Sequence, residues 1–152
     1  MTETEWDIRL SQGGDLPFIY TTWMKSYRYD SLIGQSCRNS IFFPFYNKVI
    51  DYILLQPDTQ VLVACSKEEP EVIFAYMVTQ GEILHYVFTK EAFRRQGIAK
   101  SLYEAANAPK IYSQKTFQSR PIIEKNEDAL TFNPFLLFKH QGDPSWQENQ
   151  EP

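Results

Sequence analysis

The pattern of apolar and polar residues changes three times in the first third of the chain. Residues 6–10 alternate between apolar and charged side chains and predict a first strand. Residues 13–15, Gly-Gly-Asp, predict a turn and a helix N-cap, and apolar residues at helical spacing over 16–27 predict the helix. Residues 31–39 are polar, which favours a loop. A second helix is predicted over 44–56, starting at a proline and ending before another.

Three runs of strand length follow. Residues 61–65 are continuously apolar, which is typical of a central strand, and 72–79 and 83–88 are joined by a Gln-Gly turn. An amphipathic helix is predicted from Ile98, and residues 110–115 can form a further strand. This order predicts the α+β fold class, with a mixed, mostly antiparallel sheet of about six strands flanked by helices.

The carboxy-terminal part is less regular. Residues 118–128 are polar and interrupted by a proline, so any helix there is short. Residues 130–138 are strongly apolar around an Asn-Pro pair and predict a terminal strand or a bent hairpin. With 152 residues and 43% apolar side chains, we expect one domain over 1–141. The polar, acidic residues 142–152 predict a disordered tail.

Charge and cysteine content narrow the function classes. A formal net charge of −4 argues against a general nucleic-acid binder. No apolar run approaches the ~18 residues of a membrane span, and the amino terminus lacks the apolar core of a signal peptide. Cys37, Cys65, His85 and His140 are isolated from one another, so no metal-ligand cluster is visible. Two cysteines without a pairing pattern favour a reducing cytoplasm.

A basic glycine loop, Arg94-Arg95-Gln96-Gly97, lies between the strand at 83–88 and the helix from Ile98. The first amides of a helix lack intrahelical partners and carry a partial positive charge, so they can bind a phosphate group. We expect Gly97 to let an anion approach the backbone, with positive charge added by the two arginines and Lys100. An ordinary strand-to-helix turn with surface arginines is the alternative.

The residues Arg94-Arg95-Gln96-Gly97-Ile98-Ala99 resemble the Arg/Gln-x-x-Gly-x-Gly/Ala signature of the GCN5-related N-acetyltransferases, the GNAT family. The order of elements over about residues 6–112 resembles that family as well. The resemblance implies acetyl-CoA as co-substrate, with its pyrophosphate on this loop and its pantetheine arm in a gap between the motif strand and the strand at 110–115. The implied cofactor-binding residues are Val87, Phe88, Thr89, Arg94, Arg95, Gln96, Gly97, Ile98, Ala99 and Lys100.

Residues 110–138 depart from the family, because the expected fourth helix would be short here. The stretches KIYSQKT and FNPFLLF resemble the carboxy-terminal half of small GNAT-like proteins of tailed phages. The divergence leaves two functions open. One is an N-acetyltransferase acting on an unidentified amine of a small molecule or a protein. The alternative is a catalytically inactive GNAT-like binding or regulatory protein, phage-encoded and acting on a host protein.

Acetyl transfer to an amine requires a polarised thioester carbonyl, a neutral amine and a proton for the departing thiolate. The backbone amide of Val87 or Thr89 is the candidate for polarising the carbonyl. Glu82 and His85 are candidate bases, with a surface charge and a structural histidine as their alternatives. Tyr112 is the candidate acid, on the strand after the motif helix. The acceptor is expected to enter beside the first two helices, near Trp23, Tyr27 and Arg28.

Overall fold

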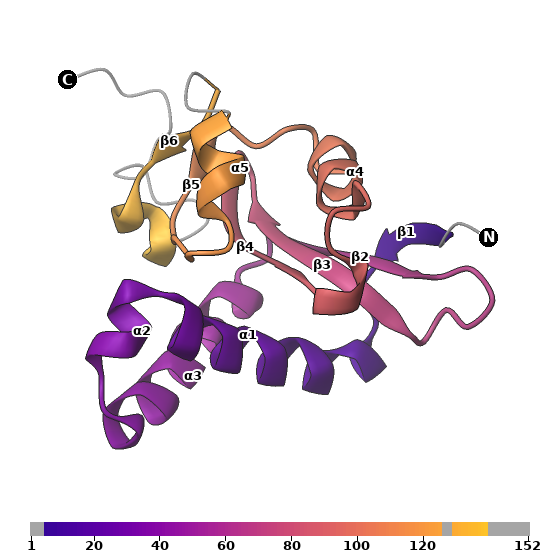
Figure 1. The fold of residues 1–152 in the computed structure, drawn as a ribbon. Helices are drawn as coiled ribbons and strands as arrows, with labels where there is room; N and C mark the ends of the chain where they lie inside the picture. Colours follow the sequence, from indigo (N-terminus) through magenta and orange to yellow (C-terminus); the bar gives the residue numbers. More distant parts are fainter. Residues whose placement is uncertain (1–4, 126–128, 140–152) are drawn as a thin grey trace.

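The computed structural model describes residues 5–125 and 129–139. Its centre is a six-stranded sheet in the order β1-β2-β3-β4-β5-β6 (Figure 1). The strands are β1 (Trp6–Leu10), β2 (Thr59–Ser66), β3 (Ile73–Gln80), β4 (Ile83–Thr89), β5 (Ile111–Tyr112) and β6 (Thr131–Phe132). Neighbours from β1 to β4 are antiparallel, whereas the β4–β5 and β5–β6 pairs are parallel. The predicted α+β class and mostly antiparallel sheet are confirmed.

Helices cover both faces of the sheet. Helices α1 (Leu16–Asp30) and α3 (Asn39–Leu55) lie on one face, and α4 (Ile98–Ala105) lies on the other (Figure 1). The remaining helical elements are α2 (Leu32–Ser36), α5 (Arg120–Lys125) and the 3-10 turns η1 (Gly13–Asp15), η2 (Glu91–Phe93) and η3 (Pro134–Phe138). Each face has its own apolar cluster, because side chains alternate between the faces along each strand. None of the described helices is long and apolar enough to cross a membrane.

The face covered by α1 and α3 is packed with aromatic rings. Trp23 is fully buried and stacks on Tyr86 with ring centres 5.2 Å apart. Tyr27 stacks on Tyr46 at 4.7 Å, and the Trp23 indole N–H donates to the Tyr46 hydroxyl at 2.9 Å. The buried indole N–H and hydroxyl groups therefore have hydrogen-bond partners inside this layer, as a buried aromatic core requires.

The boundary between the first two helices differs from the sequence prediction. The residues expected to form a loop instead form α2 and the start of α3, which begins five residues before Pro44. Ser31 caps α2 by accepting the Gly34 amide at 2.9 Å. A Cβ on Gly34 would lie 2.1 Å from the Tyr27 carbonyl oxygen, so only glycine allows α2 to lie this close to α1. Pro44 is tolerated near the start of α3, where Phe42 is already part of the core.

The carboxy-terminal predictions also need correction. The strand expected over 110–115 is limited to the two residues of β5. The apolar segment at 130–138 contains β6 and then η3, rather than a long strand or a hairpin. Asn133 accepts the Phe135 amide at 3.1 Å and so starts η3. The predicted tail at 142–152 lies outside the described residues.

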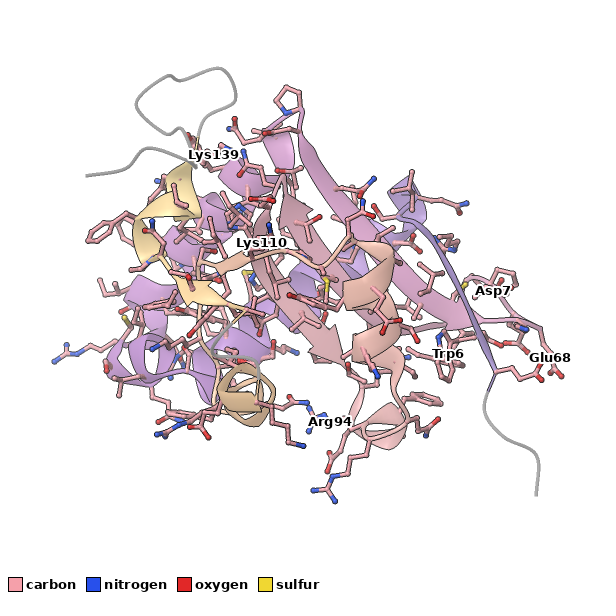
Figure 2. All side chains as sticks on the ribbon, turned by 90° about the horizontal axis from the view of Figure 1, so that it is seen from above. Trp6, Asp7, Glu68, Arg94, Lys110 and Lys139 are labelled. Carbon is pink, nitrogen blue, oxygen red and sulfur yellow. The ribbon has the colours of Figure 1, made fainter. Side chains whose placement is uncertain are left out.

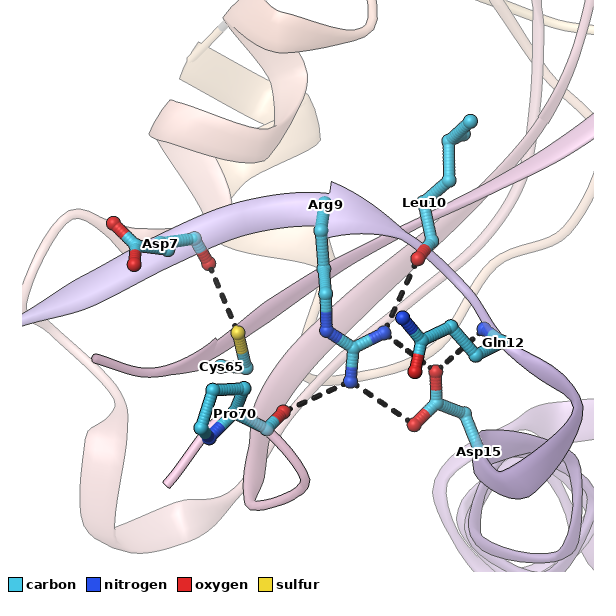
Figure 3. Close-up of polar contacts among 7 residues, drawn as sticks. All are labelled: Asp7, Arg9, Leu10, Gln12, Asp15, Cys65 and Pro70. Atoms are coloured by element: carbon cyan, nitrogen blue, oxygen red, sulfur yellow. Dashed lines mark hydrogen bonds and ion pairs between the residues drawn. The ribbon is translucent and has the colours of Figure 1, made fainter. Parts of the chain in front are cut away.

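An ion pair ties the end of β1 to η1 (Figure 3). Arg9 donates to both carboxylate oxygens of Asp15, at 2.7 and 3.1 Å, and to the Pro70 carbonyl at 2.9 Å. Asp15 also accepts the Gln12 amide at 2.7 Å, so its carboxylate closes η1 instead of capping α1. The Arg9 guanidinium lowers the pKa of Asp15 below its usual value.

Candidate active site

The basic loop joins β4 to α4 through two residues in the left-handed region. Arg95 has φ of 65°, and Gly97 has φ of 84° at the N-cap of α4. The Ser101 amide makes the first helical bond, to the Gly97 carbonyl at 3.0 Å. The amides of residues 98–100 therefore precede the hydrogen-bond ladder of α4, beside exposed loop residues. This arrangement suits an anionic ligand.

Gly97 is required by its backbone conformation. A Cβ added there would meet no atom within 4 Å, but its positive φ is one that other residues rarely adopt. Arg94 turns back toward the sheet, and its Nε donates to the Thr89 carbonyl at 3.2 Å. Figure 2 shows Arg94 and Lys139 toward opposite ends of the sheet. The loop thus closes against the end of β4 with its charged residues at the surface.

Strands β4 and β5 separate soon after they meet. They pair only at Ile83 with Ile111 and at Leu84 with Tyr112. The Ser113 amide donates to the Leu84 carbonyl at 3.1 Å, beyond the last paired residues. The remainder of β4 runs on without β5 beside it. The predicted separation between the motif strand and the strand at Ile111 is therefore present.

The separation exposes one edge of β4. The Lys90 amide donates to Phe74 of β3 at 2.9 Å, and every second residue of β4 before it, Phe88 and Tyr86, faces β3 in the same way. Val87 and Thr89 consequently present their amides and carbonyls to the open edge. Phe88, also expected to bind cofactor, contributes its backbone to the ladder and packs its partly buried ring against the aromatic core.

A bulge interrupts β4 where the strands separate. Val78 pairs with Tyr86 and Thr79 pairs with Leu84, so His85 is an extra residue on β4. This extra residue makes a β-bulge in the motif strand. It turns the backbone at the point where the open edge begins.

His85 is buried and bonded at both ring nitrogens. Nδ1 lies 2.7 Å from the Ser113 hydroxyl, and Nε2 lies 2.9 Å from Oε1 of Gln80. The Gln80 amide nitrogen donates to Asp58 at 2.9 Å, which leaves Gln80 Oε1 to accept from His85. The neutral ring therefore carries its proton on Nε2 and accepts from Ser113. Burial, with a smaller contribution from Lys139, lowers the pKa of His85 to about 3, which favours the structural alternative over a base.

Glu82 lies at the hairpin end of β4. Its carboxylate is 3.9 Å from the Lys110 ammonium group, and it lines a surface hollow of about 660 Å³ together with Gly81, Asn107 and Pro109. At about 3.3 Å per residue, β4 places Glu82 roughly 20 Å from Thr89. Glu82 is thus remote from the basic loop, and the surface-charge alternative describes its surroundings.

Tyr112 occupies the last paired position before β4 and β5 separate. Its ring lies 5.1 Å from the Phe132 ring, and the residue is almost entirely buried. The next residue, Ser113, reaches His85, so alternation places Tyr112 on the opposite face, the side of α4. Its role as an acid stays a prediction, now with a defined position beside the separation.

The expected entrance for an acceptor is mostly core. Trp23 and Tyr27 are buried in the aromatic layer, so they line no entrance on this side. Arg28 lies at the surface, and its Nε donates to Asn39 at 3.0 Å. Of the three residues, Arg28 alone reaches the surface.

Ser113 and Gln114 are polar residues of the site that the sequence analysis did not single out. Both are buried, and Gln114 donates to the His85 carbonyl at 3.0 Å. The available signal was a polar pair directly after the apolar start of the strand. At Ser113 and Gln114, side-chain hydrogen bonds to His85 replace the backbone pairing of β5 with β4.

Comparison with solved structures identifies the fold. Apo-form YjaB from Escherichia coli superposes with a TM-score of 0.57 at 17% identity, over 80% of each chain. A candidate acetyl transferase from Pyrococcus furiosus gives a TM-score of 0.55 at 11% identity, over 93% of this chain and 87% of that one. The GCN5-related glucosamine N-acetyltransferase region of a fungal multi-domain β-N-acetylglucosaminidase gives 0.56 at 13%, over 85% of this chain and 17% of the whole enzyme.

The chain has the GNAT fold. No protein-family model matches the sequence, and no curated protein gives a significant match. With identities of 11 to 17%, these likenesses establish the fold. The loop at Gly97 and the separation after Leu84 lie where the sequence resemblance placed them.

Proposed function

We propose that this protein is an N-acetyltransferase that uses acetyl-CoA and acts on an amine. The observation that carries the proposal is the combination of an open β4 edge with a basic glycine loop, at the N-terminus of α4, at the same end of the strand. Val87 and Thr89 face that edge, and Gly97 starts α4 directly after it. Acetyl-CoA combines a pyrophosphate, an extended arm and a thioester, which fits such a surface.

The loop residues have the properties needed for pyrophosphate. The amides of Gln96, Gly97, Ile98 and Ala99 would donate hydrogen bonds, and Arg94, Arg95 and Lys100 would add positive charge. The amide of Val87, or that of Thr89, would donate to the thioester carbonyl. Tyr112 would supply a proton to the departing thiolate. The acceptor amine, of a small molecule or a protein, would approach from the side of Arg28.

The proposed location is the cytoplasm, that of the host if the chain is phage-encoded. Cys37 and Cys65 are both free thiols, as a reducing compartment favours. The source and the compartment both stay predictions.

Binding and turnover test the proposal separately. Acetyl-CoA should raise the melting temperature of the full chain, whereas a single-stranded oligonucleotide at the same charge concentration should not. Release of free thiol from acetyl-CoA should then depend on an amine from a panel of polyamines, aminoglycosides and lysine peptides. Absence of stabilisation by both acetyl-CoA and CoA would refute the cofactor assignment.

A binding protein without turnover is the second candidate. The observation that favours it is the placement of the two candidate bases. His85 is buried and neutral, and Glu82 lies beyond the paired residues of β4 and β5, 3.9 Å from the Lys110 ammonium group. Positioning alone can still accelerate transfer to an amine that arrives unprotonated. Tight acetyl-CoA binding without thiol release above the buffer rate, for every amine tested, would support the binding protein.

A further inference from the structure

The side chain of Gln114 occupies the point where β4 and β5 separate. β5 ends at Tyr112, and Ser113 makes the last backbone bond across the two strands, to Leu84. The next β4 carbonyl on that side belongs to His85, in the bulge, and it accepts the Gln114 side-chain amide at 3.0 Å. Gln114 thus takes the place that a backbone amide would have had if pairing had continued.

The orientation of Gln114 is fixed from both sides. The Trp23 indole N–H can only donate, so the Tyr46 hydroxyl accepts from it at 2.9 Å. The same hydroxyl then donates its hydrogen bond to Oε1 of Gln114. Nε2 of Gln114 must then face the His85 carbonyl, which can only accept. Four groups from α1, α3, β4 and the segment after β5 are joined in one directed chain of hydrogen bonds. Turning Gln114 away would leave two buried polar groups without partners.

The surroundings of Gln114 are closed. His85 is 1% exposed, Tyr86 5%, Tyr46 7% and Gln114 itself 9%. Tyr86 is held by Trp23 on its ring and by Ser26 on its hydroxyl. The narrow end of the separation is therefore filled by side chains that are already bonded and stacked, and extra atoms placed there would meet a packed core.

We infer that Gln114 is the end stop of the proposed acyl-CoA site and limits it to short acyl groups. This inference rests on the proposed function. From Thr89 beside the loop to His85, the open edge is about 13 Å long at 3.3 Å per residue. An arm that starts at the loop and follows this edge toward the strand junction brings its acyl end to Gln114. A two-carbon acyl group ends there, and each added methylene competes with the side chain for space.

Titration of the full chain with acetyl-, butyryl- and hexanoyl-CoA tests the stop without knowledge of the acceptor. A pocket wall discriminates a single misplaced methylene by about 10- to 200-fold, so hexanoyl-CoA should bind the parent at least about tenfold more weakly than acetyl-CoA. Gln114→Ala should reduce that ratio to within about twofold, because it removes the obstructing atoms. Gln114→Leu should keep the ratio, since it keeps the volume and loses only the hydrogen bonds.

Gln118→Ala is the matched control, because Gln118 is exposed on the same segment. It should leave the ratio unchanged. If Gln114→Ala does not fold by circular dichroism, Gln114→Asn, one methylene shorter, should admit butyryl-CoA and still exclude hexanoyl-CoA. Equal binding of all three thioesters by the parent would overturn the stop. So would an unchanged hexanoyl-to-acetyl ratio in a folded Gln114→Ala, or an unchanged butyryl-to-acetyl ratio in a folded Gln114→Asn. Failure of every thioester and of CoA to bind would instead refute the proposed function.

Discussion

The two ends of β4 differ in how completely their groups are used. At the closed end, Ile83 and Leu84 pair with strands on both sides, and both ring nitrogens and the carbonyl of the adjacent His85 have hydrogen-bond partners. At the open end, Val87 to Thr89, no strand of the described residues lies along one edge, and the loop that follows, as far as Gly97, carries exposed charges and helix amides. The same strand is held by hydrogen bonds on both sides at one end and has an unpaired edge at the other.

This difference predicts which substitutions along β4 should change stability and which should change ligand binding. Polar groups at the closed end have protein partners, so changing them should mainly alter stability. The charged side chains of the loop at the open end, Arg94, Arg95 and Lys100, are exposed, so changing them should mainly alter ligand binding. Tyr112 lies at the boundary, which makes it the sharpest test of the comparison.

Tyr112→Phe should lower turnover by about 100-fold or more if the hydroxyl is the general acid, because only the proton donor is removed. The dissociation constant of acetyl-CoA should stay unchanged in a titration. Tyr103→Phe is the control, since the Tyr103 hydroxyl on α4 donates to the Pro109 carbonyl at 2.6 Å. Turnover that is equal in Tyr112→Phe and the parent would dismiss Tyr112 as the acid.

His85→Leu should lower the free energy of unfolding by about 2–5 kcal/mol, because the Ser113 hydroxyl and the Gln80 side-chain carbonyl oxygen lose a buried partner. Urea denaturation measures the change. Ser113→Ala, which removes one of the two bonds, should cost less. A midpoint for His85→Leu equal to that of the parent would show that the closed end is not an anchor.

Acidification should weaken the closed end through His85. Its pKa is lowered from 6.5 to about 3 on folding, so the unfolded chain binds a proton that the folded chain does not. Stability should therefore fall as the pH drops below 6.5, by about 2 kcal/mol between about pH 6.5 and about pH 5. His85→Gln should lack this component. Parallel pH profiles for the two proteins would contradict the buried neutral ring.

Gly97→Val should weaken acetyl-CoA binding by about tenfold or more, because a β-branched residue resists the positive φ that starts α4 at the loop. Isothermal titration measures the loss. Gly13→Val is the control, since a Cβ on Gly13 would also meet open space, whereas the Gly13 backbone has no positive φ. Parent-like affinity in Gly97→Val would make the loop assignment wrong.

Arg95→Ala should have the smallest effect, about two- to fivefold on acetyl-CoA affinity, because an exposed charge is screened by solvent. The loss should shrink further at raised salt. Lys48→Ala, on α3, serves as the control for a general change of charge. A loss larger than that of Gly97→Val would mean that the arginine, and not the loop backbone, holds the ligand.

Much of the fold was predictable from local patterns. Strands β2, β3 and β4 and helix α4 lie where the apolar runs, the Gln-Gly turn and the helical spacing placed them. The loop at Gly97 lies between strand and helix, as its glycine and arginines indicated. The start of α3 was missed, because Pro44 suggested a beginning when it is an interior position. The early end of β5 was missed, because no local pattern shows how the next two residues bond to β4. Ser113 donates its backbone amide to Leu84, whereas Gln114 donates its side-chain amide to His85.

By itself, the sequence determined the elements whose stability comes from their own periodicity, and the loop whose backbone needs a glycine. Only the tertiary structure decided the surroundings of His85, Glu82 and Gln114. Partners distant in the chain decide what each of them does. His85 is a buried, neutral ring bonded to Ser113, Glu82 is a surface carboxylate near Lys110, and Gln114 is held in place by Tyr46. Burial and long-range hydrogen bonding set these properties, and both depend on which elements pack together rather than on neighbours in sequence.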